Sequence, residues 1–185
     1  MAGERELLID RSIKAHARSG AKDLLRAESG ATAVEFAFVA APFLALLYAI
    51  LETALVFFAQ QVLQTATTQA ARAIMTGQAQ SQSMTATQFQ QSVCTHATTL
   101  FNCSNVYVTV NTFSSFSSVS MPSPIQNGKF SGASMSYSPG GPGDIEIVQV
   151  YYPWPVFSGP LGFALSNTSN GNDVLIATAA FRNEP

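Results

Sequence analysis

Apolar residues run almost without interruption from Ala31 to Ala59, and this is the strongest feature of the hydrophobic pattern. No charged side chain falls between Phe36 and Leu51. At ~1.5 Å per residue the run forms a helix of ~42 Å, which exceeds the ~30 Å hydrocarbon core of a bilayer. The pattern therefore predicts a transmembrane helix over 31–59.

Two other interpretations of this run are weaker. A cleaved secretory signal has an apolar core of ~7–15 residues followed by a small-residue cleavage site, whereas this run is about twice as long and continues into Gln60 and Gln61. A buried helix of a soluble protein would need more apolar chain around it than the polar remainder offers. We therefore favour a helix that spans the membrane.

Beyond the membrane segment the same helix is predicted to continue outward over 60–77. Apolar residues recur there at steps of three and four, as on one face of a helix, and Gly77 follows the last of them as a natural C-terminal stop. Pro42 lies inside the membrane part and permits a kink. The polar segment 78–85 is predicted to be a linker.

The segment 78–185 predicts a small α+β head. A second helix is expected over about 87–101, and strands are expected over 106–110, 144–152 and 174–181. The prolines that follow Tyr152 predict the end of the middle strand. The Ser-, Pro- and Gly-rich segment between the first two strands indicates a surface excursion, with a hairpin as one option. A long helix, a short helix and about three or more strands favour an antiparallel sheet laid on the long helix.

The charge distribution predicts the orientation in the membrane. Six of the nine Lys and Arg residues precede the apolar run, which places 1–30 in the cytoplasm and the chain after about residue 60 outside, in the periplasm if the cell is bacterial. The formal net charge of −2 gives no indication of nucleic-acid binding.

Cys94 and Cys103 are the only cysteines, and both fall on the external side. An even count in an oxidising compartment predicts a disulfide, which stabilises a short loop by roughly 2–3 kcal/mol; two unpaired buried thiols are the alternative. His96 is the only external histidine, so we expect no metal site and no cofactor.

Two glutamates stand at the ends of the uncharged run. A carboxylate near the bilayer centre costs ~2.5–3.5 kcal/mol and marks a partner or a pathway, although Glu35 and Glu52 could instead reach headgroup water. The two lie ~25 Å apart along a helix and point ~100° apart, so they cannot share one proton. Two separate contacts between molecules, or two interfacial residues, remain open.

The segment Ser29–Phe36 resembles the processing and assembly signature of Tad (Flp-type) pilins, and the fuller pattern resembles the TadE-like minor pseudopilins. The resemblance covers about 28–73 and resumes in the last dozen residues. The pattern includes Glu52, Phe58-Ala-Gln-Gln61, Ala70-Ala-Arg72-Ala and the terminal Ala180-Phe-Arg-Asn-Glu-Pro185.

This resemblance implies a pilin-like fold and a prepilin peptidase that cuts after Gly30. Ala31 would then be the new N-terminus, and Glu35, as fifth residue, would face the α-amino group of a neighbouring subunit's first residue. A paired ammonium and carboxylate offset desolvation costs that neither bears alone. Phe36 stands where major pilins usually have Tyr, which favours a minor subunit. The implied partners are the membrane, other pilins and pseudopilins, and the peptidase.

Three function classes differ in their support. The leading hypothesis is a structural minor pseudopilin of the inner membrane, because small residues in the span permit close packing of neighbouring helices. The alternative is a single-pass membrane protein whose head binds a ligand or a cell-envelope partner. Its basis is an aromatic cluster that either forms an exposed patch or seals the head against the helix: Tyr151, Tyr152, Trp154 and Phe157.

An enzyme is not expected. Asp144 and Glu146 share one face of a predicted strand, but no base or nucleophile accompanies them, and the chain has no glycine-rich phosphate loop. The turn at 167–173 is rich in Asn and Asp, yet its spacing is wrong for an EF-hand loop, and turn chemistry explains it. We therefore expect neither catalytic residues nor a small-molecule substrate.

Overall fold

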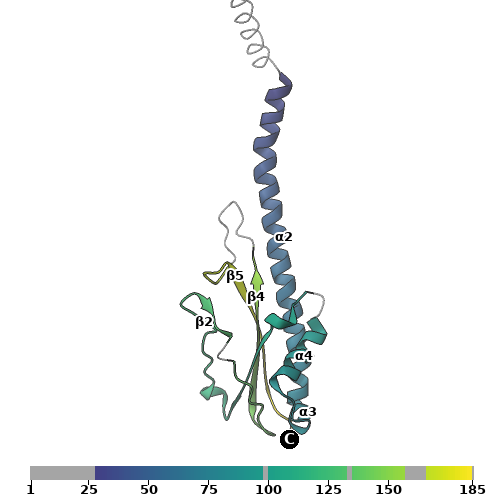
Figure 1. Cartoon of the computed structure of the whole chain (residues 1–185), viewed down its shortest axis with the longest axis vertical. Coiled ribbons are helices and arrows are strands. Elements are labelled where there is room, and N and C mark those ends of the chain that lie inside the picture. Colours follow the sequence, from purple (N-terminus) through teal and green to yellow (C-terminus); the bar gives the residue numbers. More distant parts are fainter. Residues whose placement is uncertain (1–27, 98–99, 133–134, 157–165, 185) are drawn as a thin grey trace, which may run out of the picture. The chain divides into compact units, whose positions relative to one another are not determined.

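The computed structural model describes residues 28–97, 100–132, 135–156 and 166–184 (Figure 1). The chain divides into two compact units, 1–47 and 48–185. In the first, the described residues belong to the N-terminal part of helix α2. The second holds the remainder of α2 and an α+β head, which confirms the predicted fold class.

Helix α2 extends over Glu28–Met75 and passes Pro42 without interruption. It ends where the sequence predicts, since Gly77 adopts a left-handed conformation with φ 72°. The predicted linker after it is wrong in part, because Gln78–Ser81 forms a short helix, α3.

Helix α4 extends over Ala86–Ala97 and is shorter than predicted. A capping box fixes its start: the Gln88 backbone N–H donates to Thr85 Oγ1 at 3.3 Å, and the Thr85 N–H donates to Gln88 Oε1 at 2.8 Å. The short 3₁₀ helix η1, Cys103–Asn105, then leads into the sheet.

Three strands form an antiparallel sheet in the order β1-β4-β5. Strand β1 is Tyr107–Phe113, β4 is Ile145–Pro155 and β5 is Asn172–Arg182. The sequence predicted all three strands, but it ended the middle one too early. Strand β1 pairs with β4 only as far as Tyr151, so beyond that residue one side of β4 is a free edge. Because an edge tolerates proline, β4 continues through Pro153 and Pro155.

The segment between β1 and β4 contains the hairpin that the sequence left as an option. Strands β2, Ile125–Gln126, and β3, Lys129–Phe130, pair across Asn127 and Gly128, both with positive φ. The 3₁₀ helix η2, Phe116–Ser118, precedes them.

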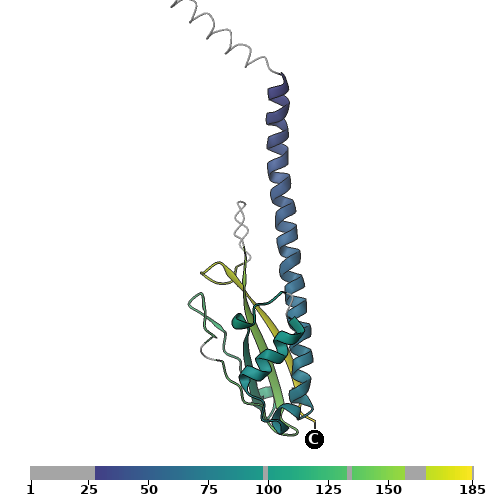
Figure 2. The same ribbon diagram turned by 45° about the vertical axis from the view of Figure 1, so that its right-hand side comes forward.

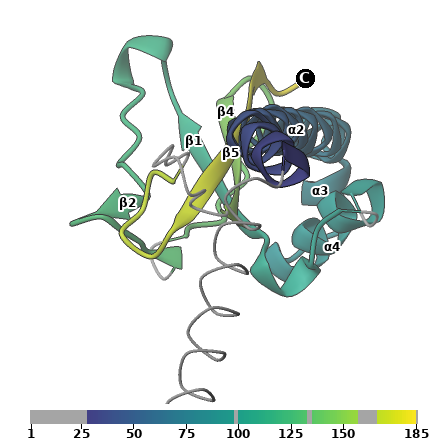
Figure 3. The same cartoon turned by 90° about the horizontal axis from the view of Figure 1, so that it is seen from above.

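The helices cover one face of the sheet and the hairpin segment covers the other (Figure 3). On the helix side, Ala59, Leu63 and Ile74 of α2 form one core with Phe89 and Val93 of α4 and the inward row of the sheet. On the opposite side, the Phe130 ring packs edge-on against Tyr107 at 5.0 Å between centroids. Both faces of β4 are therefore buried.

Candidate functional site

The N-terminal half of α2 exposes an apolar surface in each of the two units. In the first unit Phe36 and Phe38 are 73% and 77% exposed, and in the second Phe57 is 71% exposed. Among the described residues, α2 is the one helix long and apolar enough to cross a membrane. Large exposed apolar surfaces mark sites of membrane or protein contact, so this surface is a candidate for either.

Glu35 lies on this surface and is exposed. Its carboxylate forms no hydrogen bond or ion pair with the described residues. Gly30 lies in the first turn of α2, with no other group within 4 Å of its hypothetical Cβ. The part of the leader that precedes Glu28 lies outside the described residues. Glu52, the second predicted assembly residue, is half-buried.

The surface of α2 changes character at Phe58 and Ala59. Phe58 is 58% exposed, whereas Ala59 is fully buried and begins the face that packs on the head. From there the buried positions of the helix recur at the predicted steps of three and four, although Thr67 and Ala71 were not predicted among them: Leu63, Ala66, Thr67, Ala70, Ala71 and Ile74. Within the second unit, α2 thus carries the last exposed apolar residues and also the residues that pack in the core of the head.

Two glutamines on α2 form hydrogen bonds with backbone groups at the free edge of β5. Gln60 Nε2 donates to the carbonyl oxygen of Ile176 at 2.8 Å. Gln64 Nε2 donates to the carbonyl oxygen of Thr178 at 2.9 Å, and Gln64 Oε1 accepts from the Thr178 N–H at 3.2 Å. Because edge strands otherwise leave such groups unpaired, these side chains fix the sheet on the helix. The sequence analysis did not predict this contact. The local signal for it is the spacing of the two glutamines, which lie four residues apart and therefore on the same face of the helix.

The C-terminal residues attach to the far end of α2 (Figure 2). The Glu184 N–H donates to the carbonyl oxygen of Met75 at 2.9 Å, which satisfies a backbone group at the helix end. Asn183 is buried, and its Nδ2 donates to the carbonyl oxygen of Gly141 at 3.1 Å. Asn183 and Glu184 of the family-like terminal pattern therefore have a structural role.

Glu146 is the buried carboxylic acid of the head, with an exposed fraction of 0%. Its Oε1 accepts from Thr112 Oγ1 at 3.0 Å, from Asn183 Nδ2 at 3.3 Å and from the Gly140 N–H. Burial raises the pKa of Glu146; these three hydrogen bonds lower it, and the charge of Asp144 raises it again. Sequence reasoning placed Glu146 beside Asp144 but gave no indication that it is buried.

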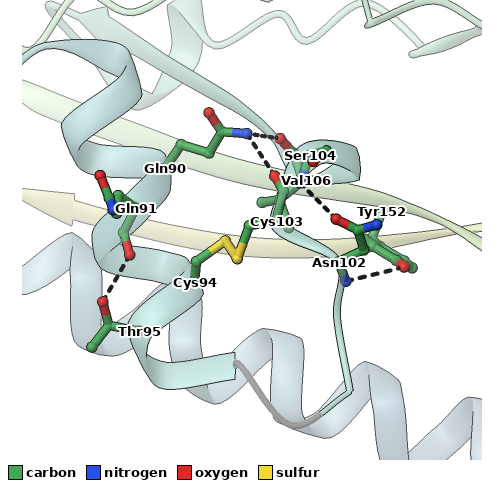
Figure 4. Close-up of a disulfide and its surroundings, with 9 residues drawn as sticks. All are labelled: Gln90, Gln91, Cys94, Thr95, Asn102, Cys103, Ser104, Val106 and Tyr152. Carbon is green, nitrogen blue, oxygen red and sulfur yellow. Dashed lines mark hydrogen bonds between the residues drawn. A yellow bond between two sulfur atoms is a disulfide. The ribbon is translucent and has the colours of Figure 1, made fainter.

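The predicted disulfide is present (Figure 4). It joins Cys94 on α4 to Cys103, with 5.8 Å between their Cα atoms. Gln90 Nε2 reinforces the same connection by donating to the carbonyl oxygens of Cys103 at 2.9 Å and Val106 at 2.7 Å. The disulfide and the Gln90 hydrogen bonds therefore both connect α4 to the segment that leads into β1.

The described residues of the aromatic cluster do not form the exposed patch on which the ligand-binding alternative rests. Tyr151 and Tyr152 are buried, and Trp154 is half-buried. The Phe101 ring packs edge-on against Tyr152 at 4.8 Å and against Trp154 at 5.9 Å between centroids. The described residues of this cluster therefore pack within the head. Phe157 lies outside the described residues.

His96 does not join the neighbouring carboxylates Asp144 and Glu146. His96 is exposed on α4, whereas Glu146 is buried on β4. Among the residues that the structure describes, no group of three or more His, Cys, Asp and Glu side chains could hold a metal ion.

Residues 30–72 match the family described as TadE-like protein. The match confirms over this segment the resemblance seen in the sequence, and it suggests a protein associated with the Tad pilus. It includes Glu35, the apolar surface, and both Gln60 and Gln64. Comparison with curated proteins and with solved structures gave no match.

Proposed function

We propose that the chain is a minor pseudopilin that takes part in the assembly or priming of a Tad (Flp-type) pilus. The observation that carries this proposal is the exposed apolar surface of α2 with Glu35 on it, inside the segment that matches TadE-like proteins. A helix of this kind can pack against lipid before assembly and against other helices during it. The proposed role is structural and not catalytic.

The proposed orientation follows from the flanking charges. The basic residues before the span keep the N-terminus in the cytoplasm, and the head then lies in the periplasm of a bacterium with α2 anchored in the inner membrane. The disulfide supports this placement, because such bonds persist in oxidising compartments.

Glu35 is proposed to set the register between subunits. After a prepilin peptidase cuts behind Gly30, the α-amino group of Ala31 on a neighbouring subunit would neutralise the Glu35 carboxylate. Each charge alone opposes burial among apolar helices, whereas the pair offsets that cost. Small residues on the same helix, such as Ala37, Ala41 and Ala45, would allow the close approach that this pairing needs.

The experiment replaces the chromosomal copy with Glu35→Gln, which keeps the shape of the side chain and removes its charge. We expect the variant to insert in the membrane, to resist extraction by alkaline carbonate, and to abolish piliation as counted by electron microscopy. Glu184→Gln is the matched control, since this exposed head residue should leave piliation unchanged. Normal numbers of pili on Glu35→Gln cells would contradict the proposal.

A further inference from the structure

The two cysteines of the disulfide differ in their access to solvent. Cys94 lies on α4 with an exposed fraction of 3% and belongs to the core of the head. Cys103 begins η1 and is exposed. A thiolate must reach a sulfur directly in order to attack it, so the Cys103 side of this bond is the reactive side.

A groove between α4 and η1 leads to the disulfide. Both cysteines line it, next to Gln90, Gln91 and Ser104 (Figure 4). Its volume of about 440 Å³ lies within the range of about 300–1,000 Å³ that sites for small ligands occupy. Because the groove is open to solvent, a small molecule can reach the bond in the folded head.

The lining of the groove suits a short peptide that carries a thiol. The exposed side chains of Thr87, Gln91 and Ser104 offer hydroxyl and amide groups, which can donate to and accept from a peptide backbone. No charged side chain belongs to the described lining, so an anionic thiolate meets no like charge there. The two sulfurs are the reactive groups of the lining.

Hydrogen bonds connect α4 to η1 independently of the sulfurs. Gln90 Nε2 donates to the carbonyl oxygens of Cys103 at 2.9 Å and Val106 at 2.7 Å. The Ser104 N–H donates to Asn102 Oδ1 at 3.1 Å, which fixes the start of η1. These contacts would keep Cys103 close to Cys94 while the disulfide is open, so the bond could form again without refolding of the head.

We propose that this groove is a site of thiol–disulfide exchange, in which a short peptide thiol reacts with Cys103 Sγ. The peptide thiolate attacks Cys103 Sγ and forms a new disulfide as the bond to Cys94 breaks. The electron pair of the broken bond goes to Cys94 Sγ, which takes a proton from water. In the reverse step the Cys94 thiolate attacks Cys103 Sγ and expels the peptide thiolate, so the cycle needs no separate oxidant or reductant.

The burial of Cys94 favours the reverse step. A thiolate on Cys94 would lie among apolar side chains of the core, where a charge is costly. The peptide adduct on Cys103 is therefore a reversible state, in which hydrogen bonds alone connect α4 to η1. The exchange takes place in the head and does not depend on the proposed pilus function.

The test uses the purified full chain in detergent, with reduced glutathione as the peptide thiol. After a short exposure the chain is denatured in iodoacetamide, and mass spectrometry of its peptides locates both modifications. We expect glutathione on Cys103 and the alkyl group on Cys94, with an excess of about tenfold over the opposite arrangement. In urea that unfolds the chain, glutathione should appear on both cysteines equally.

A variant of the groove tests the route to the bond. Gln91→Trp should fill the groove with a large side chain and slow the appearance of glutathione on Cys103 several-fold. Since Gln91 is exposed on α4, this variant should keep the fold. Gln69→Trp is the matched control at an exposed position of α2, and the rate should be that of the original chain.

Three results would overturn the proposal. The first is glutathione on Cys94 of the folded chain in an amount equal to or greater than that on Cys103. The second is an adduct that forms only when urea is present, because the bond would then be closed to thiols in the folded head. The third is an equal rate in Gln91→Trp and in the original chain, which would exclude the groove as the route.

Discussion

Gln64 of α2 binds both backbone groups of Thr178 on β5, 114 residues away in the chain. Its Nε2 donates to the Thr178 carbonyl oxygen at 2.9 Å, and its Oε1 accepts from the Thr178 N–H at 3.2 Å. A single side-chain amide therefore acts on this edge as a neighbouring strand would. The contact connects the helix proposed for assembly with the sheet of the head.

Gln64→Ala should destabilise the head. Loss of two hydrogen bonds to a strand edge costs about 1–2 kcal/mol, since a typical bond contributes about 0.5–1.5 kcal/mol. The free energy of unfolding of the full chain in detergent, from urea titration followed by circular dichroism, measures this loss. Gln69→Ala provides the control, because Gln69 is exposed on the same helix; equal losses in both variants would show that the edge contact is unimportant.

Phe101→Ala should loosen the aromatic cluster and change the environment of Trp154. Phe101 is buried and packs on both Tyr152 and Trp154, so its removal should cost about 3–5 kcal/mol. Trp154 is the only tryptophan, and its fluorescence should shift to longer wavelength and quench more readily with acrylamide. Phe116→Ala, at a side chain 66% exposed, should change neither stability nor emission. An unchanged Trp154 spectrum in Phe101→Ala would contradict the packing described.

Reduction of the disulfide should lower the stability of the head by about 2–3 kcal/mol, as expected for a short closed loop. The measurement is urea unfolding of the full chain with and without dithiothreitol. A double variant, Cys94→Ser with Cys103→Ser, should match the reduced chain and should not respond to the reductant. If dithiothreitol left the unfolding curve of the original chain unchanged, this contribution would be refuted.

Asp173 should make the stability depend on pH. Burial raises its pKa above the ordinary Asp value, so the folded state binds this proton more tightly than the unfolded state. The resulting stabilisation is complete below the unfolded pKa, about 4, and is lost as the pH rises through the folded pKa. Asp173→Asn should therefore melt higher than the original chain at pH 7 and at the same temperature at pH 3. A difference of equal size at both pH values would exclude titration of Asp173 as its cause.

The elements of the fold were predictable where a local pattern determines them. The apolar stripe and Gly77 gave the extent of α2, and the runs of β-branched residues gave the three strands, because helix and strand periodicities are properties of neighbouring residues. The prolines of β4 misled the prediction, since their tolerance depends on where β1 stops pairing.

The contacts between distant segments were not predictable in this way. Glu146 lies in the same strand row as Val148 and Val150, and a carboxylate there is ordinarily interpreted as facing water. Only the fold shows that Asn183 and the Gly140 loop meet it from other parts of the chain. Likewise, the pairing of Gln64 with Thr178 depends on a register that no local pattern encodes.

The central claim is that α2 is the assembly helix of a processed pseudopilin, and the intact mass of the membrane-extracted chain tests it most directly. The protein should be isolated from matched cells with and without an active prepilin peptidase. Our account predicts a chain that begins at Ala31 when the peptidase is present and at Met1 when it is absent. A chain that retains residues 1–30 in both strains would contradict the account.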